Sequence, residues 1–411
     1  MPFDIIDAIL GELNTRGDVE TLRNCAVLSR SLLQPARRRL FSTITLYGGG
    51  GSSQRLHALL LKDPRLLTYF RTLEIPDLPW WPEENPALHL LCLIAEKAVL
   101  RSISFDAPRI CWAGYFSKLQ PVLSQILKSP LLHTVRIINI CISFPLEYLG
   151  MSPRLRHLAF SCQVRSPSDA ESLRVTTPPP PLVVETPLES LHIGQFVPEQ
   201  LVKYLTTRCN SGISRLRELS IDSLEPDTMN AASQVLQQAK DTLESLIFID
   251  PSYLPRDSNI NNSKLDYRSL PHLRFMTFYI IYPGVFRFRL MVDILSEYGL
   301  PRTVEGLTIV LELKAGIGDS DDILEEISDG ISCVSADSAL AGACLGRESS
   351  MLKQVEIVLL INSEEVNFGD FEEGLPLWLP SLHDAGLLVA STASVEDKWK
   401  VLTSLSIASR S

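Results

Sequence analysis

Leu216-Arg217-Glu218-Leu219-Ser220-Ile221 is a hexamer with apolar residues at its first, fourth and sixth positions. The last two apolar residues alternate with one polar residue, which is typical of a short strand whose alternate side chains face one way. A single hexamer of this kind arises easily by chance. Its weight therefore depends on whether the pattern recurs along the chain.

The same pattern recurs along most of the sequence. The intervals between successive copies mostly lie between 27 and 33 residues, with one of 23 and one of 48. Such regularity predicts a repeat architecture. The other copies have the apolar trios Phe70/Leu73/Ile75, Leu100/Ile103/Phe105, Leu132/Val135/Ile137, Leu155/Leu158/Phe160, Leu188/Leu191/Ile193, Leu243/Leu246/Phe248, Leu273/Met276/Phe278, Val304/Leu307/Ile309, Leu352/Val355/Ile357 and, more weakly, Leu382/Ala385/Leu387.

Amphipathic segments lie between these predicted strands, for example at residues 116–128, 199–209, 228–240 and 286–298. Their apolar residues have helical spacing. A strand followed by a helix of this length suits a parallel sheet, because parallel strands need a crossover connection. The sequence therefore predicts an α/β fold, an irregular solenoid of strand–helix units with parallel strands over residues 47–390.

Two segments interrupt this array, and a third follows it. Residues 166–187 contain four consecutive prolines, Pro178 to Pro181, and are predicted to form a surface loop. Residues 315–350 carry an acidic group around Asp319 to Glu326, which indicates an insertion or an unrecognised repeat. Residues 391–411 are rich in serine and alanine and are predicted to form a C-terminal cap or tail.

The first 46 residues have a different pattern. Ile5, Ile6, Ile9, Leu10 and Leu13 share one face of a helix. Asp18 is suited to cap a second helix, whose apolar face would hold Val19, Leu22, Ala26 and Leu28. Pro35 is suited to the first turn of a third helix. Three helices in so short a segment cannot bury a core alone, so they need a neighbour.

Residues 1–46 resemble the fungal form of the F-box motif. The opening Met1-Pro2-Phe3-Asp4-Ile5-Ile6-Asp7-Ala8-Ile9-Leu10-Gly11-Glu12-Leu13 is similar to the family's Leu-Pro-x-Glu-Ile-Ile-x-x-Ile-Leu-x-x-Leu. Asn24 to Leu32 and Arg38-Arg39-Leu40-Phe41 look like the later parts of the motif. The tryptophan common in the motif is replaced by leucine, and the repeats lack the asparagine typical of regular leucine-rich repeats.

This resemblance implies a receptor of an SCF-type ubiquitin ligase, with no catalysis of its own. The N-terminal helices would bind a Skp-type adaptor and its cullin complex, and the repeats would hold an unidentified protein substrate. The implied adaptor-binding residues are Pro2, Ile5, Ile6, Ile9, Leu10, Leu13 and Leu22. The alternative is that these helices only cap the open end of a repeat scaffold that has no ligase association.

Composition and charge limit the partners and the cellular compartment that we expect for this protein. The net charge of −10 disfavours nucleic acid, whose binders usually carry a basic stripe. No apolar run reaches the ~18 residues that span a bilayer, and the acidic N-terminus lacks a secretory h-region. The eight cysteines show no C-x-x-C pair. We therefore expect reduced thiols and a cytoplasmic or nuclear protein without a membrane partner.

No motif for catalysis, a cofactor or a metal is present in the sequence. Gly48 to Gly51 is not followed by Gly-Lys-Ser/Thr, so it does not form a phosphate loop. There is no G-x-S-x-G and no His-Glu-x-x-His. We therefore expect a non-enzyme without a cofactor. A deep pocket lined by perturbed titratable groups would instead favour a hydrolase or transferase with a diffuse site.

Overall fold

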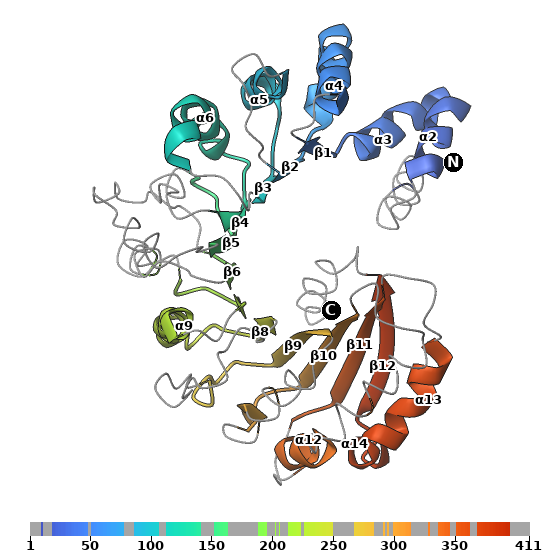
Figure 1. The fold of residues 1–411 in the computed structure, drawn as a ribbon, viewed down its shortest axis with the longest axis vertical. Coiled ribbons are helices and arrows are strands. Elements are labelled where there is room, and N and C mark those ends of the chain that lie inside the picture. The colour runs from blue at the N-terminus through green and yellow to red at the C-terminus, as the bar shows by residue number, and fades with distance from the viewer. Residues whose placement is uncertain are drawn as a thin grey trace. The chain divides into compact units, whose positions relative to one another are not determined.

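The computed structural model describes residues 10, 19–47, 51–77, 86–106, 112–140, 152–162, 188–194, 202, 205, 213–222, 226–249, 267–282, 291, 294–295, 299–313, 328, 336–345, 351–361 and 368–394. The chain forms two compact units, Met1–Leu188 and Glu189–Ser411. Each unit has an α/β fold in which parallel strands alternate with helices (Figure 1). This is the solenoid-like arrangement that the recurring hexamers predict.

The first unit begins with helices and continues as a parallel sheet in which each strand pairs with the next in sequence. Helices α4, α5 and α6 all lie on the same side of their strands (Figure 1). Its elements are α2 (Val19–Leu28), α3 (Arg30–Leu40), β1 (Thr43–Tyr47), α4 (Gly51–Lys62), the 3₁₀-helix η1 (Pro64–Tyr69), β2 (Thr72–Asp77), α5 (Pro86–Lys97), β3 (Ser102–Asp106), α6 (Trp112–Leu127), β4 (Thr134–Ile140) and β5 (His157–Cys162).

The second unit repeats the scheme, with strands paired in sequence order from β6 to β12. Its elements are β6 (Ser190–Ile193), β7 (Glu218–Ile221), α9 (Pro226–Gln238), β8 (Ser245–Ile249), β9 (Phe275–Tyr282), β10 (Gly306–Leu313), α12 (Ala336–Leu345), β11 (Gln354–Ile361), α13 (Phe368–Trp378), α14 (Pro380–Asp384) and β12 (Leu388–Ser394). Because β10 pairs directly with β11, the 48-residue interval is one long repeat whose connection contains α12.

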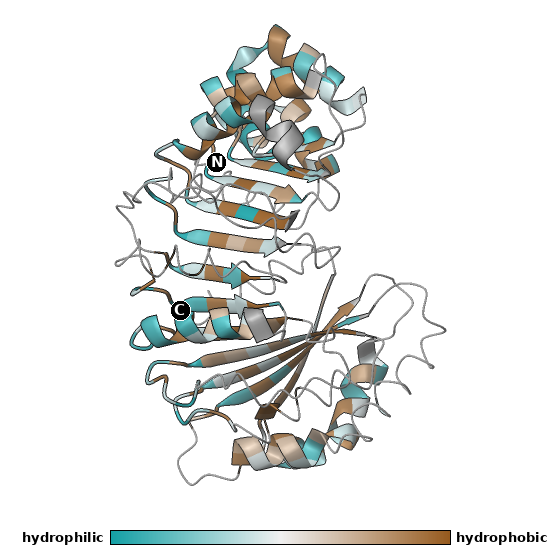
Figure 2. Ribbon diagram, turned by 60° about the vertical axis from the view of Figure 1, so that its left-hand side comes forward, coloured by the Kyte–Doolittle hydropathy of each residue, from teal (hydrophilic) through white to brown (hydrophobic). Residues whose placement is uncertain are grey.

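The strands pair in the register that the hexamers define. The fourth residue of one hexamer lies opposite the fourth residue of the next, as in Leu73↔Ile103 and Leu219↔Leu246. These residues are fully buried in both units, and Figure 2 shows hydrophobic residues recurring along the strands. Burying one such side chain stabilises the fold by roughly 1.5–3 kcal/mol, so the recurring pattern stacks into a continuous core in each unit.

The repeat pattern begins earlier than predicted and ends later. Phe41, Ile44 and Leu46 form one more apolar trio, and Ile44 lies opposite Leu73. The boundary predicted after residue 46 therefore falls inside β1. At the other end, the predicted trio beginning at Leu382 is wrong, because Leu382 belongs to α14. Strand β12 begins at Leu388, which lies opposite Val355 in the place predicted for Ala385, so the true register is three residues later. The strand also includes residues 391–394 of the predicted tail.

The third N-terminal helix also differs from the prediction. Helix α3 begins at Arg30, and Pro35 lies inside it, not in its first turn. The hydroxyl of Ser29 accepts a hydrogen bond from the Ser31 N–H at 3.2 Å, which caps the helix. Pro35 has no N–H to donate to the Ser31 carbonyl, so a proline at this position costs helix stability. Pro35 and the adjacent Ala36 are both buried, so this part of the helix is packed in spite of the proline.

Main-chain hydrogen bonds join successive turns of the array at the start of each strand. We call the second residue of each hexamer the ladder position. The carbonyl of Arg71, for example, accepts the N–H of Arg101 at 2.7 Å and that of Ser102 at 3.0 Å. The same double acceptance is made by the carbonyls of Ser42, Arg101 and His133 in the first unit and of Glu189, Arg217, Glu244 and Arg274 in the second.

The second unit has a further hydrophobic cluster on the strand positions that alternate with the hexamer trios. This cluster consists of Ile247, Ile249, Tyr279, Val310, Val358 and Leu360, all buried. The Tyr279 hydroxyl donates a hydrogen bond to the Glu312 carboxylate. Strands β9 to β11 are thus apolar on both faces, which explains their long hydrophobic runs.

Candidate functional site

Helices α2 and α3 pack against each other around a small core. Leu10, Leu22 and Ala36 are buried at its centre, and Cys25, Ala26 and Leu40 pack around them half-buried. The spacing of Leu22, Cys25 and Ala26 puts them on one side of α2, as an amphipathic helix requires. This helical pair holds the described part of the predicted adaptor-binding set.

Two of the seven predicted adaptor-binding residues lie in the described part of the chain. Leu10 and Leu22 are brought together, and their exposed fractions are 2% and 1%. Both side chains therefore stabilise the helical pair. Pro2, Ile5, Ile6, Ile9 and Leu13 lie outside the described residues, and their role stays a prediction.

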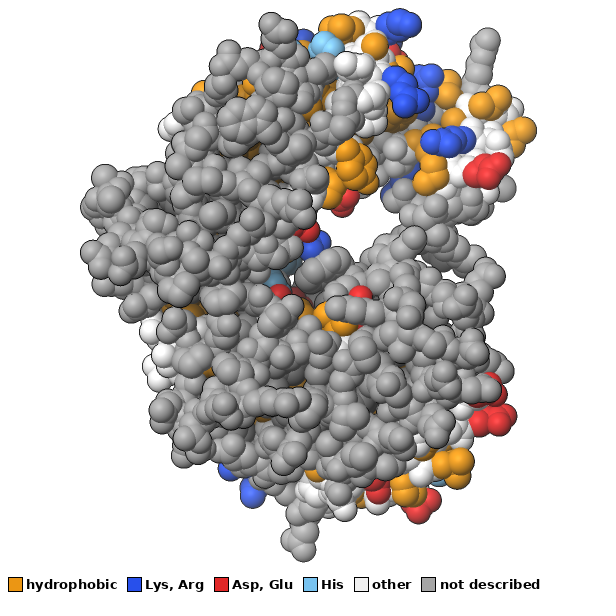
Figure 3. Space-filling model, viewed as in Figure 1, with side chains coloured by type: hydrophobic (Ala, Val, Ile, Leu, Met, Phe, Trp, Pro, Cys, Tyr) orange, Lys and Arg blue, Asp and Glu red, His pale blue; other side chains and the backbone are white. Residues whose placement is uncertain are grey.

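Exposed apolar side chains lie elsewhere on α2. Val27 is 87% exposed, Leu28 is 76% exposed and Val19 is 46% exposed. In the space-filling view, hydrophobic side chains reach the surface of the α2–α3 region beside basic ones (Figure 3). The prediction that Leu28 belongs to the apolar face of this helix is therefore wrong. At 100° per residue, Val27 and Leu28 lie about 140° and 120° away from Leu22, so the helical period contained the signal.

Helix α3 is attached to the first turn of the sheet. The Tyr69 hydroxyl in η1 donates a hydrogen bond to the Gln34 side chain. The Arg37 guanidinium lies 3.9 Å from the Asp63 carboxylate, with both side chains partly exposed. An ion pair at this exposure contributes little, about 0–1 kcal/mol. These contacts orient the helical pair against β1 and β2 within the first unit.

The first unit has polar side chains on the strand positions that alternate with the buried trios. The Thr45 hydroxyl donates to the Glu74 carboxylate at 3.2 Å, across β1 and β2. Partial burial lowers the pKa of Arg136, while the nearby Glu74 and Asp106 carboxylates raise it. This face offers hydrogen-bonding and charged groups, in contrast to the buried apolar cluster of the second unit.

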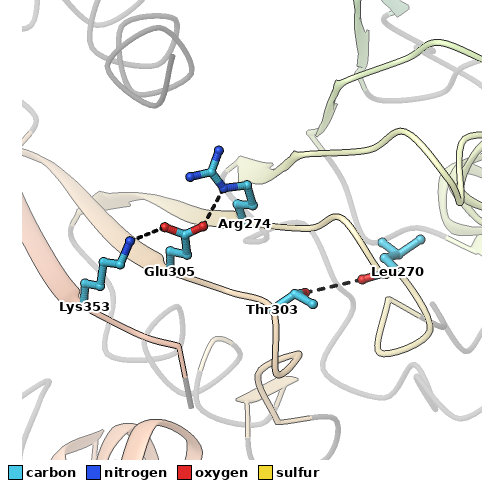
Figure 4. Close-up of polar contacts among 5 residues, drawn as sticks. All are labelled: Leu270, Arg274, Thr303, Glu305 and Lys353. Atoms are coloured by element: carbon cyan, nitrogen blue, oxygen red, sulfur yellow. Dashed lines mark hydrogen bonds and ion pairs between the residues drawn. The ribbon is translucent and has the colours of Figure 1, made fainter. Parts of the chain in front are cut away.

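In the second unit the ladder positions carry charges of alternating sign: Glu189, Arg217, Glu244, Arg274, Glu305 and Lys353. Glu305 lies between two cations, with its oxygens 2.6 Å from Arg274 Nε and 2.6 Å from Lys353 Nζ (Figure 4). The hydrogen bonds from Arg274 and then Lys353 lower the pKa of Glu305 to about 2. Beside it, the Thr303 hydroxyl donates to the Leu270 carbonyl at 3.4 Å (Figure 4).

We expect Glu305→Gln to lower the free energy of unfolding at neutral pH by about 1–2 kcal/mol, because Arg274 and Lys353 lose the carboxylate that they share. The loss stays this small because both cations are well exposed to solvent, which screens the interaction. The folded-state pKa lies below the usual 4.5, so this stability is present above pH 4.5 and is lost as pH falls toward 2. Denaturant unfolding between pH 7 and 3 should show wild type and variant converging as acid is added.

Glu244→Gln is the matched control for this prediction. Its carboxylate lies 3.7 Å from Arg217 Nε, a longer and more exposed contact. We expect a loss below about 0.5 kcal/mol. An equal loss for the two variants, or a constant difference across the pH range, would contradict the assigned role of Glu305.

The described residues also contain a pocket between α5 and α6. It has a volume of about 270 Å³, and its lining includes Ile94, Leu100, Ile126 and the charged side chain of Lys128. This lining contains no pair of acidic and basic groups. No group of three or more metal-ligating side chains occurs within the described ranges. None of the helices described there has the length and hydrophobicity needed to cross a bilayer.

No family model matches the chain, and no curated protein is a detectable relative of it.

Proposed function

We propose that this chain is a non-catalytic, substrate-recruiting receptor of an SCF-type ubiquitin ligase. Its N-terminal helices bind a Skp-type adaptor, and its repeats bind a protein substrate. The observation that carries the proposal is the exposure of Val27 and Leu28 on α2, next to a helical pair that already has its own small core. Apolar side chains in such a position are suited to become interface hot spots when a partner covers them.

Two further features support the proposal. The motif-like opening of residues 1–46 stands directly before a solenoid-like array, the order expected of an F-box-like receptor. Cys25, Cys92 and Cys344 are free thiols, which supports a reducing compartment, the cytoplasm or the nucleus, where such a ligase would act.

A repeat scaffold without ligase association is the second candidate. The contacts of α3 with η1 favour it, because a helical cap is what the open end of a repeat array needs. Capping alone, however, gives no reason for two neighbouring apolar residues of α2 to be exposed.

If the N-terminal helices bind the adaptor, Val27→Asp combined with Leu28→Asp should weaken binding to a purified Skp-type adaptor by at least about a hundredfold. Burying each side chain in the interface is worth roughly 1.5–3 kcal/mol, and each aspartate would add a buried charge. The full chain and the variant are titrated against the adaptor by isothermal calorimetry.

The matched control is Leu61→Asp combined with Leu377→Asp, two exposed leucines of α4 and α13 whose exposed fractions are 64% and 80%. It makes the same kind of change and should leave adaptor binding intact. A deletion of residues 1–41 should also abolish binding while keeping Ser42, whose carbonyl accepts hydrogen bonds from Arg71 and Thr72. Lack of adaptor binding by the wild type would favour the scaffold, and undiminished binding by the Val27/Leu28 variant would disprove docking through these residues.

A further inference from the structure

Basic side chains occupy successive ladder positions of the first unit. Arg71 precedes β2, Arg101 precedes β3, His133 precedes β4 and Arg156 precedes β5. Main-chain hydrogen bonds connect them in a row, since each N–H donates to the carbonyl of the ladder residue before it, at 2.7 Å for Arg101 and 2.9 Å for both His133 and Arg156. We call these residues, together with Arg38 of α3, the basic ladder.

The basic ladder brings like charges close together. Neighbouring parallel strands are about 4.8 Å apart, so the backbones that carry adjacent ladder side chains are separated by only about this distance. The pKa of Arg71 is lowered by burial first, and then by the positive charges of Arg101 and Arg38. Arg38 and Arg101 are exposed to solvent, and Arg71 is half-buried. The groups that act on Arg71 across this surface are therefore other cations.

The ladder positions of the second unit carry a different charge pattern, one that stabilises the fold. There the ladder alternates in sign from Glu189 to Lys353, and Glu305 bonds to cations on both sides. Like charges on neighbouring strands destabilise a sheet, and opposite charges stabilise it. Arg38, Arg71 and Arg101 thus carry a folding cost that the alternating ladder avoids, and a bound anion would offset that cost.

We propose that the basic ladder is a binding surface for an acidic segment of a partner protein. Arginine suits this role because its planar guanidinium binds carboxylate or phosphate oxygens through paired hydrogen bonds. The Arg71 Nη1 atom donates to the carbonyls of Thr68 and Phe70, at 2.8 Å each, which holds the side chain in place with further N–H donors on the same group.

The dimensions fit a short extended peptide. Four ladder positions on neighbouring strands span about 15 Å, which an extended chain covers with roughly five residues. The residue after each ladder position adds a polar group, namely Thr72, Ser102, Thr134 and His157. A segment with several aspartate, glutamate or phosphorylated residues would meet a basic side chain at each strand.

A protein segment fits this surface better than a nucleic acid. The whole chain has a net charge of −10, and nucleic-acid affinity depends on neutralising many phosphates over a long basic surface. The basic ladder spans only about 15 Å across four strands, which is short for such a surface. The surface belongs to the repeats and needs no adaptor, so this inference goes beyond the proposed ligase role and fails or succeeds independently of it.

The test uses the full purified chain without adaptor and measures fluorescence anisotropy of a labelled Glu-rich peptide, of the same peptide with phosphoserines, and of a single-stranded oligonucleotide. We expect Arg101→Glu to weaken peptide binding at least about tenfold, because it introduces a negative charge between Arg71 and His133. Its unfolding midpoint should not fall below that of wild type, since the ladder then resembles the alternating one of the second unit. Arg55→Glu on α4 makes the same charge change at an exposed site off the ladder and should change binding less than about twofold.

Binding of either peptide that Arg101→Glu weakens and Arg55→Glu does not would support the proposal; preference for the phosphoserine peptide would indicate a phosphorylated partner, and equal binding an Asp/Glu-rich one. The proposal is overturned by any of three results: no saturable peptide binding up to about 1 mM, equal losses in the two variants, or ladder-dependent binding of the oligonucleotide alone.

Discussion

Phe278→Ala should lower the unfolding free energy of the second unit by about 3–5 kcal/mol, the range expected when a large aromatic side chain is removed from a packed core. Phe278 is 1% exposed and stacks on Phe248 of the neighbouring strand, with ring centroids 5.2 Å apart and planes inclined by 14°. Phe248 in turn meets the edge of Tyr267, whose hydroxyl donates to the Ile294 carbonyl at 3.3 Å. Truncation at Phe278 leaves a cavity beside this aromatic row.

Urea unfolding followed by near-ultraviolet circular dichroism measures this loss. Leu377→Ala is the control, because Leu377 lies in the same unit with 80% of its side chain exposed. We expect its effect to stay within about 0.5 kcal/mol. Similar effects of the two substitutions would show that Phe278 is not packed as described.

Leu22→Asp should unfold the α2–α3 pair. Leu22 is 1% exposed, and its neighbours Leu10 and Ala36 offer no partner for a carboxylate. An unpaired charge in an apolar site costs several kcal/mol, which exceeds what a core of this size supplies. Hydrogen exchange measured by mass spectrometry should become fast over residues 19–40 and stay slow over β2, β3 and β4.

Val27→Asp makes the same type of change on the same helix at a side chain that is 87% exposed. It should leave hydrogen exchange of α2 and α3 near the wild-type rate. The pair of variants therefore separates a loss of adaptor binding caused by unfolding from one caused by a lost contact. Equal exchange in the two variants would contradict the assignment of Leu22 to the helical core.

Much of the fold was predictable because its signal is local and repeats. Leu73, Ile103 and Val135 could be placed opposite one another from sequence spacing alone, since each turn of the array buries the same positions. The prediction failed where composition weakened the pattern. At the last strand, alanine stands at two of the three trio positions, Ala385 and Ala390, so the trio three residues upstream, which has two leucines and one alanine, was a better match than the true strand.

The candidate site was less predictable. The helical period separates Leu22 from Val27 and Leu28, but it could not show that α2 ends at Leu28 and that no neighbouring segment covers these two side chains. The start of α3 was decided by the Ser29 cap and the burial of Ala36, which outweighed the preference of Pro35 for a first turn. At both places, packing and capping between neighbouring segments decided the structure, and the conformational preference of a single residue did not.

The sequence by itself determined the repeating strands, their register and their parallel order, because one buried trio per turn requires no knowledge of distant residues. The tertiary structure alone decided which charges meet. Arg71 and Arg101 are 30 residues apart in sequence, and Arg274 and Glu305 are 31 residues apart. The two arginines nevertheless repel each other, whereas Arg274 and Glu305 form an ion pair. Only the stacking of turns brings the ladder positions within reach, so the contrast between the basic ladder and the alternating one exists only in the folded chain.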